Sequence, residues 1–168
     1  MDFQRMSKKD DHAGERILRH WREEVPDDRL AHLIRDAARI LAKSMQIRLN
    51  EYSVSFGHWA FLRVLWVTEG LTQRELSEQV GLMEPTTFTA LKSMESQGLI
   101  ERRHQDGNRK KVHIYLTEKG RALKHELIPI AEELNEVAVR GLTEEERKIM
   151  HRGLLAVIEN LVAAGAVS

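Results

Sequence analysis

Positive charge is concentrated in one short segment of a chain whose formal net charge is zero. The segment GLIERRHQDGNRKKVHIYLTEKG, residues 98–120, places five lysines and arginines within the eleven residues from Glu101 to Lys111. Charged turns are common on protein surfaces, so a basic loop alone is weak evidence for a ligand. Guanidinium and ammonium groups do bind phosphates, however, and the neighbouring elements decide whether that chemistry applies here.

The basic residues fall between two segments with the pattern of β-strands. KVHIYL, residues 111–116, alternates apolar and polar side chains, and LIERRH, residues 99–104, provides a partner. The turn formers of QDGNRK lie between them. We therefore predict a β-hairpin whose tip carries Arg109 and Lys110.

The segment before the hairpin predicts two short helices joined by a tight turn. Thr72 and Glu75 have the spacing of a capping box, which satisfies backbone N–H groups at a helix N-terminus. This first helix is expected to end before Gly81. Pro85 suits the first turn of the second helix, and Gly98 suits its end because glycine accepts a positive φ.

The second helix has one face that suits a protein core and one that suits DNA. Helical spacing predicts that the inner face consists of Thr87, Ala90, Leu91 and Met94. The outer face is small and polar, and it consists of Pro85, Thr86, Thr89, Lys92 and Ser93. Small residues let a helix enter a major groove, where hydroxyls bind base edges or phosphates. Phe88 lies at the edge between the faces, and its position leaves open whether it packs inside or contacts a base.

A helix-turn-helix followed directly by a basic hairpin is the pattern of a winged helix. In such a module the second helix occupies the major groove and the hairpin follows the adjacent minor groove. The predicted DNA-binding residues are Thr72, Gln73, Arg74, Pro85, Thr86, Thr89, Lys92, Ser93, Arg103, Arg109, Lys110 and Lys111. The alternative is a winged-helix module that binds other proteins without sequence-specific operator binding, and the salt dependence of binding separates the two.

The same segments resemble the core of the MarR family of bacterial transcriptional regulators, over about residues 30–162. The likeness is carried by LTQRELSEQVGL, LKSMESQGLIERR and NRKKVHIYLTEKGRAL. Family members typically show an acidic residue before an arginine pair and then, after a strand, Leu-Thr-x-x-Gly. The matching residues here are Asn108, Arg109, Lys110, Leu116, Thr117 and Gly120. Asn108 departs from the acidic residue of the family pattern, although Asp106 is close enough in sequence to take its role.

The resemblance implies a mainly α-helical protein with a small β-hairpin wing, in which terminal helices interlock to form a homodimer. It also implies binding to double-stranded DNA with a palindromic operator. Two features of the sequence favour dimerisation independently. Residues 30–49 form a wide apolar stripe, and a helix that begins with a capping box at Thr143 and Glu146 carries another, which one small lobe cannot cover.

We predict three regions along the chain. An N-terminal arm covers residues 1–26 and includes a short amphipathic helix in ERILRHWREEV. Residues 27–52 and 121–168 form a helical dimerisation region. Residues 53–120 form the winged helix-turn-helix, which includes a buried helix over residues 57–69 that ends at Gly70.

The resemblance further implies a small anionic or phenolic effector bound between the dimer helices and the winged lobe. The candidate ligand-binding residues are His32, Arg35 and Arg39 on one helix and His58, Trp59 and Arg63 on the next. Arginine binds carboxylates through two parallel hydrogen bonds, and tryptophan provides an aromatic wall. Taken singly, each residue also fits a surface ion pair or the core. The predicted function is a dimeric repressor released by an aromatic acid, a phenolic compound or a related CoA thioester.

Other classes of function find little support in the sequence. No HExxH motif, phosphate-binding glycine loop or nucleophile elbow occurs, so we expect neither an enzyme nor a bound cofactor. The histidines show no ligand pair at helical spacing, which disfavours a metal site. The absence of cysteine excludes thiol redox sensing. No run of about 18 apolar residues and no signal-peptide centre occurs, so we expect no membrane partner and a cytoplasmic location.

Overall fold

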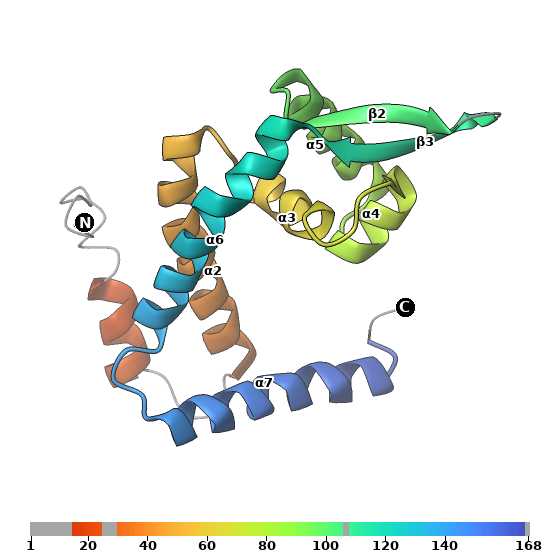
Figure 1. Cartoon of the computed structure of the whole chain (residues 1–168). Coiled ribbons are helices and arrows are strands. Elements are labelled where there is room, and N and C mark those ends of the chain that lie inside the picture. Colours follow the sequence, from red (N-terminus) through yellow and green to blue (C-terminus); the bar gives the residue numbers. More distant parts are fainter. Residues whose placement is uncertain (1–14, 25–29, 106–107, 167–168) are drawn as a thin grey trace. The chain divides into compact units, whose positions relative to one another are not determined.

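The computed structural model describes residues 15–24, 30–105 and 108–166, which are mainly helical with one small antiparallel sheet (Figure 1). The chain forms two compact units, residues 1–43 and 44–168. The predicted class, mainly α with a small β-hairpin wing, is confirmed.

The first unit contains a short helical segment and most of helix α2 (Leu30–Leu49). The short segment spans residues 15–24 and ends in a π-helix, η1 (His20–Glu24). The indole Nε1 of Trp21 donates a hydrogen bond of 3.1 Å to the Asp36 carboxylate on α2. The short helix predicted in the N-terminal arm is therefore present over residues 15–24.

The second unit begins with the last turn of α2 and continues into helix α3 (Phe56–Leu65). A 3₁₀ turn, η2 (Asn50–Tyr52), joins them, and Ser53 follows it in a left-handed conformation. Ser55 caps α3, because its Oγ accepts a hydrogen bond of 3.0 Å from the third backbone N–H of the helix.

The predicted end of α3 at Gly70 is wrong, because the helix ends at Leu65. The chain leaves the helix to join the sheet, where the Gly70 N–H donates a 2.8 Å hydrogen bond to the Ile114 carbonyl. Gly70 does take a positive φ, of 78°, but it does so in this connecting loop and directly against the Tyr115 ring. The hydrogen bond between Gly70 and Ile114 thus accompanies the end of the helix at Leu65, although the apolar sequence continues through Trp66 and Val67.

The predicted helix-turn-helix is confirmed as α4 (Gln73–Val80) and α5 (Glu84–Ser96). Gly81 turns the chain between them with a φ of 71°, and Gly98 follows α5 with a φ of 67°. A two-residue strand, β1 (Leu71–Thr72), precedes α4. β1 could not be predicted from the sequence, because two residues are too few to show an alternating pattern.

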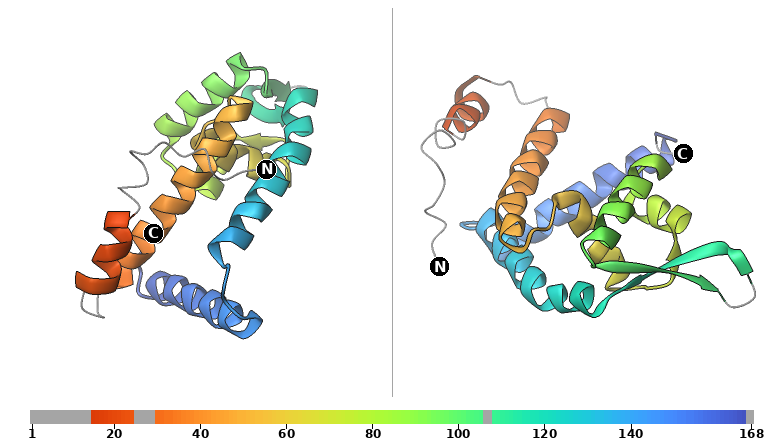
Figure 2. Two further views of the ribbon diagram at one scale, coloured as in Figure 1. Left: turned by 90° about the vertical axis from the view of Figure 1, so that its left-hand side faces the viewer. Right: turned by 90° about the horizontal axis from the view of Figure 1, so that it is seen from above.

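The sheet has the strand order β1-β3-β2, with β2 spanning Ile100–Gln105 and β3 spanning Asn108–Leu116. Arg102 lies opposite Ile114, and Glu101 lies opposite Tyr115. The predicted hairpin is confirmed, but its strands continue further into the predicted turn of residues 105–110. Gln105 pairs with Asn108 across the hairpin, and the polar residue types do not prevent this pairing because backbone groups form the ladder. The ribbon extends away from the helices of this unit (Figures 1 and 2).

Two long helices complete the second unit. Helix α6 (Glu118–Ala138) starts at the Thr117 cap, and helix α7 (Glu144–Ala163) starts at the predicted capping box of Thr143 and Glu146. None of the residues of α7 is buried in the single chain. The core of the chain is formed by Met45, Leu49, Val54, Trp59, Phe61, Leu62, Leu65, Leu76, Leu91, Met94, Leu99, Ile100, Ile114, Leu116, Leu127, Ile130 and Leu134.

Candidate nucleic-acid interface

The base of the interface is fixed by the cap of α4. The Thr72 Oγ1 accepts a hydrogen bond of 3.3 Å from the Glu75 N–H, and the Glu75 carboxylate accepts one of 2.7 Å from the Thr72 N–H. Hydrogen bonds from the Thr72 N–H and from the Thr72 hydroxyl to the Glu75 carboxylate hold the pKa of Glu75 below its usual range. The Thr72 hydroxyl also donates to this carboxylate at 2.7 Å. The Thr72 side chain therefore has a structural role as the cap of α4.

Helix α5 presents the two faces that the sequence predicts. Thr87, Leu91 and Met94 are buried and Ala90 is half-buried. On the opposite face Pro85, Thr86, Thr89 and Lys92 are exposed, while Ser93 is half-buried. The hydroxyl of Thr89 donates a 3.1 Å bond to the Pro85 carbonyl, which leaves its oxygen available as an acceptor. The Thr86 side chain has no such bond among the described residues.

The first turn of α4 adds further polar groups to the predicted interface. Gln73 is half-buried and Arg74 is exposed. The Arg74 guanidinium donates a 3.0 Å hydrogen bond to Glu78, one turn further along the helix. An exposed pair of this kind is weak, so a phosphate can replace the carboxylate at little cost.

Arg102, which is not among the predicted DNA-binding residues, joins the wing to α5. Its guanidinium lies 5.6 Å from the centre of the Phe88 ring and forms an ion pair of 3.1 Å with Glu95. Phe88, whose placement the sequence left open, is 47% exposed and lies beside this cation. The alternation of side chains along β2 could have indicated this position, because Arg102 lies on the same face of the strand as the buried Ile100.

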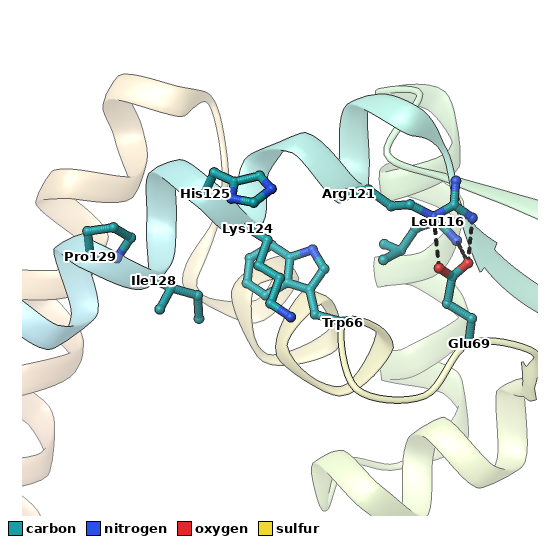
Figure 3. Close-up of a pocket in the computed structure, with 8 residues that line it drawn as sticks. All are labelled: Trp66, Glu69, Leu116, Arg121, Lys124, His125, Ile128 and Pro129. Atoms are coloured by element: carbon teal, nitrogen blue, oxygen red, sulfur yellow. Dashed lines mark hydrogen bonds and ion pairs between the residues drawn. The ribbon is translucent and has the colours of Figure 1, made fainter.

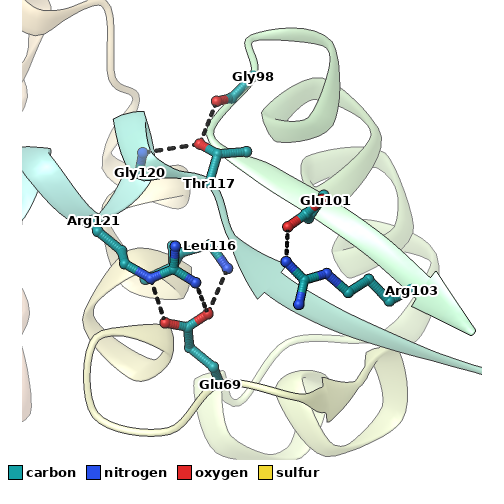
Figure 4. A network of polar contacts seen from close by, with 8 residues as sticks. All are labelled: Glu69, Gly98, Glu101, Arg103, Leu116, Thr117, Gly120 and Arg121. Carbon is teal, nitrogen blue, oxygen red and sulfur yellow. Dashed lines mark hydrogen bonds and ion pairs between the residues drawn. The ribbon is translucent and has the colours of Figure 1, made fainter. Parts of the chain in front are cut away.

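Arg103 lies on the other face of the sheet from Arg102. It pairs with Glu101 on the same strand (Figure 4). Its guanidinium lies 4.7 Å from the centre of the Tyr115 ring. His113 lies opposite it on β3 and contacts the Gly70 carbonyl through Nδ1 at 2.8 Å. Arg103 is therefore held against the sheet surface rather than against α5.

The tip of the wing carries the remaining predicted cations. Lys111 is exposed on β3. The backbone of Arg109 and Lys110 also belongs to β3, but their side chains, like residue Asp106, lie outside the part of the chain that the structure describes. Their role in DNA binding stays a prediction.

A polar network ties the base of the wing to α6 (Figure 4). The Arg121 guanidinium donates hydrogen bonds of 2.9 and 2.8 Å to the two carboxylate oxygens of Glu69, which also accepts a 3.0 Å bond from the Leu116 N–H. The hydrogen bonds from Arg121 make the largest contribution to lowering the pKa of Glu69, and the Leu116 N–H lowers it further. The Thr117 hydroxyl donates to the Gly98 carbonyl at 2.6 Å and accepts from the Gly120 N–H at 3.1 Å.

The predicted effector residues occupy different surroundings in the two units. In the first unit Arg35 and Arg39 both bind the Asp36 carboxylate, at 3.3 and 3.4 Å, and His32 is exposed. The Trp21 hydrogen bond, followed by these cations, lowers the pKa of Asp36.

The second unit holds the other three predicted effector residues on α3. His58 and Trp59 are buried, and burial lowers the pKa of His58. The Arg63 guanidinium lies 5.9 Å from the centre of the Trp59 ring. Arg63 is the exposed member of this set, so it is the one of the three most accessible to a ligand.

The described residues also bear on other kinds of function. Within the described ranges, no cluster of three or more histidine or carboxylate side chains is arranged to hold a metal ion. No helix among the described residues is both long enough and apolar enough to span a bilayer.

Comparisons with known proteins agree with the geometry. A model of the MarR family matches residues 54–112. The organic hydroperoxide resistance transcriptional regulator of Bacillus subtilis (strain 168) is 29% identical over 138 residues, which cover 80% of this chain and 90% of that protein. The uncharacterized HTH-type transcriptional regulator YwhA of the same strain is 32% identical over 100 residues, which cover 60% and 69%.

A solved structure also resembles the chain closely. A transcriptional regulator from Listeria monocytogenes, complexed with 26mer DNA, superposes with a TM-score of 0.72 at 28% identity. The match covers 83% of this chain and 92% of that one. The likeness therefore includes the helices outside the winged module as well as the module itself.

Proposed function

The chain belongs to the MarR family of DNA-binding transcriptional regulators. From this premise we propose that it is a dimeric repressor released by a small aromatic acid, a phenolic compound or a related CoA thioester. One observation carries the proposal. The exposed face of α5, with Thr86, Thr89 and Lys92, adjoins a hairpin wing that Arg102 fastens to the same helix. We propose that α5 reads the major groove and that the wing binds phosphates of the adjacent minor groove.

Dimerisation follows from the exposed apolar side chains of α7. Leu154, Leu155 and Ile158 are 44%, 45% and 59% exposed in the single chain, and Leu161 is 52% exposed. A continuous apolar face of this kind marks a protein interface. A two-fold dimer would present two α5 helices to successive major grooves, so we propose a palindromic operator whose half-sites lie about 34 Å apart.

We propose that the effector binds non-covalently. The hydroperoxide regulator that resembles this chain is named for an oxidant, but a chain without cysteine has no thiol to oxidise. His32, Arg35 and Arg39 of α2 and His58, Trp59 and Arg63 of α3 remain the proposed ligand residues. A ligand carboxylate would compete with the Asp36 carboxylate for Arg35 and Arg39, the two cations that already bind a carboxylate in this unit.

Selection of genomic fragments bound by the full-length protein tests the proposal, followed by titration of the selected DNA at several salt concentrations. We expect a palindromic sequence and an affinity that falls linearly in log salt. Lys92→Ala should weaken binding, and Lys148→Ala on α7 serves as the matched control. If no sequence is enriched and binding ignores salt, the alternative of a protein-interaction module is correct.

The effector proposal has its own test. Ligand titration against a fluorescent operator should show release of the wild-type protein by an aromatic acid, a phenol or a CoA thioester. Arg39→Ala should raise the ligand concentration required and leave ligand-free affinity for DNA nearly unchanged. An unaltered ligand response in Arg39→Ala and in Arg63→Ala would reject these residues while the repressor proposal stands.

A further inference from the structure

One side of α5 carries an aromatic ring and a carboxylate that both contact a cation of the wing. Phe88 and Glu95 are seven residues apart, which is about two helical turns, so they lie on the same side of the helix. Strand β2 lies beside α5 (Figure 1), and its Arg102 reaches both residues. The guanidinium lies over the Phe88 ring, 5.6 Å from its centre, and 3.1 Å from the Glu95 carboxylate. Arg102 therefore lies between the exposed face of α5 and the wing.

The ion pair with Glu95 leaves most hydrogen-bond donors of Arg102 unused. The 3.1 Å approach joins Nε of Arg102 to a Glu95 oxygen, but this Nε is buried and the contact lacks the direction of a hydrogen bond. Within the described ranges, the Nη atoms of Arg102 donate no hydrogen bond either. The outer edge of the guanidinium therefore has N–H groups available for a second anion.

The Phe88 ring limits the orientations of this guanidinium without neutralising its charge. Arginine stacks on aromatic faces because the guanidinium is planar and weakly hydrated, and the ring attracts the cation. Phe88 is 47% exposed, so burial in the core does not account for a phenylalanine at this position. Contact with Arg102 gives the ring a second role, as a platform that holds the cation in place.

The position of Arg102 corresponds to one part of a bound duplex. In the proposed binding mode α5 occupies a major groove and the wing follows the adjacent minor groove. One sugar-phosphate backbone separates two adjacent grooves, so a side chain between the helix and the wing faces phosphates rather than base edges. Arg102 is the cation that contacts both of these elements.

We propose that Arg102 binds a phosphate of this intervening backbone, with Phe88 as its platform and Glu95 as the anion that DNA displaces. The inference rests on the proposed function and adds Arg102 to its phosphate contacts. Both Arg102 and Glu95 are partly exposed, and ion pairs of this kind are weak, so a phosphate displaces the carboxylate readily. Glu95 thus lowers the affinity for every DNA sequence alike, because it competes with phosphate for the same cation.

Fluorescence anisotropy of the full-length protein with selected operator and with random duplex, at several salt concentrations, tests the site. Arg102→Gln should weaken binding to both DNAs about tenfold and lower the slope of log affinity against log salt by about one unit. Glu95→Gln should strengthen binding to both DNAs about twofold to fivefold, because the competing anion is removed. In the Arg102→Gln background this gain should shrink to that of Glu126→Gln, which removes an exposed carboxylate on α6.

Phe88→Leu tests the platform. It should weaken binding to operator and random DNA by the same factor, about twofold to fivefold, because the contact with the cation is lost while an apolar side chain remains. A loss on operator DNA alone would assign Phe88 to a base contact and overturn its role as a platform.

The sign of the Glu95→Gln effect separates phosphate binding from a purely structural link between the wing and α5. A structural link predicts weaker DNA binding when the ion pair is removed, so weaker or unchanged binding overturns the proposal. An unchanged salt slope in folded Arg102→Gln, or an equal gain from Glu95→Gln in both backgrounds, also overturns it. Urea unfolding shows whether Arg102→Gln folds, and the Glu95→Gln result decides the question if it does not. A wild type that binds no DNA would reject the proposed function as well, whereas operator binding without this coupling rejects the role of Arg102 alone.

Discussion

The backbone of Gly120 lies directly against the carbonyl of Leu99, so closely that a β-carbon at position 120 would overlap this oxygen. The contact joins the first turn of α6 to the start of the wing, where the Thr117 N–H also donates to the same Leu99 carbonyl at 3.1 Å. The Gly120 carbonyl in turn accepts from the Trp66 indole. Gly120 is therefore required for close approach of backbone to backbone.

Gly120→Ala should destabilise the protein by about 2–4 kcal/mol, because a rigid carbonyl must move to make room. Chemical unfolding by urea measures the change. Gly153→Ala is the matched control, since it lies inside α7 and, within the single chain, a β-carbon there would have no atom within 4 Å beyond its chain neighbours and the backbone of its own helix. The control should be neutral or more stable by about 0.5–1 kcal/mol, and equal losses in both variants would contradict the packing argument.

Thr86→Ala or Thr89→Val should weaken binding to the selected operator by about 1–3 kcal/mol and change binding to random DNA far less. The reason is that these exposed side chains lie on the face of α5 proposed to read base edges. Fluorescence anisotropy with both DNAs measures the difference. An equal loss on random DNA would assign the threonines to backbone contacts instead.

Arg109→Ala should weaken operator and random DNA by similar factors. A phosphate contact carries no sequence information, and its loss should lower the slope of log affinity against log salt by about one unit. Arg140→Ala, an exposed cation just after α6, provides the comparison. If the slope for Arg109→Ala equals that of the wild type, the wing does not bind phosphate through this residue.

Leu154→Asp or Ile158→Asp should convert the dimer to a monomer or unfold it. Both side chains are exposed in the single chain, so the substitution should change the stability of the monomer little. If a second chain covers them, the substitution would bury an unpaired carboxylate. Light scattering and thermal unfolding at several protein concentrations report on assembly. A folded dimer with unchanged stability in either variant would place the interface elsewhere, and Asn160→Asp controls for added charge on α7.

The buried His58 should make the free energy of unfolding depend on pH below the ordinary histidine pKa of 6.5. Its pKa is lowered, so the unfolded chain takes up a proton at a higher pH than the folded chain does. The free energy of unfolding should therefore fall as pH drops through the unfolded value of 6.5 and level off below the folded pKa. His58→Gln should flatten this decline in urea titrations.

Glu69 should make the free energy of unfolding depend on pH in a second, more acidic range. The pKa of Glu69 is also lowered, so its stabilising contribution is present above 4.5 and is lost as pH falls through the folded value. Wild type and His58→Gln should lose this contribution alike. A pH profile of His58→Gln that matches the wild type between about pH 7 and 5.5 would show that His58 is not the source of the upper decline.

Local patterns predicted much of the winged module. The capping boxes at Thr72 and Thr143 and the glycine turn at Gly81 are contacts between residues close in sequence, and the structure confirms them. The alternation of β3 and the faces of α5 were also predictable, because one periodic side of each must be buried.

Features that depend on contacts distant in sequence could not be predicted in the same way. The end of α3 is set by pairing between Gly70 and Ile114, and β1 exists only because β3 lies beside it. The link from Arg102 to Phe88 and Glu95 and the hollow lined by Trp66 and Lys124 (Figure 3) likewise arise from elements that fold together. No spacing in the sequence encodes them.

The strand order β1-β3-β2 leaves one long side of β2 without a neighbouring strand among those described. Unpaired backbone groups at a sheet edge are a template onto which other chains add strands, and this is a common route to aggregation. Two copies of IERRHQ paired edge to edge would bring the arginines of one copy close to those of the other. We expect Arg102 and Arg103 to disfavour such pairing of two β2 edges, a role for basic residues that is separate from DNA binding.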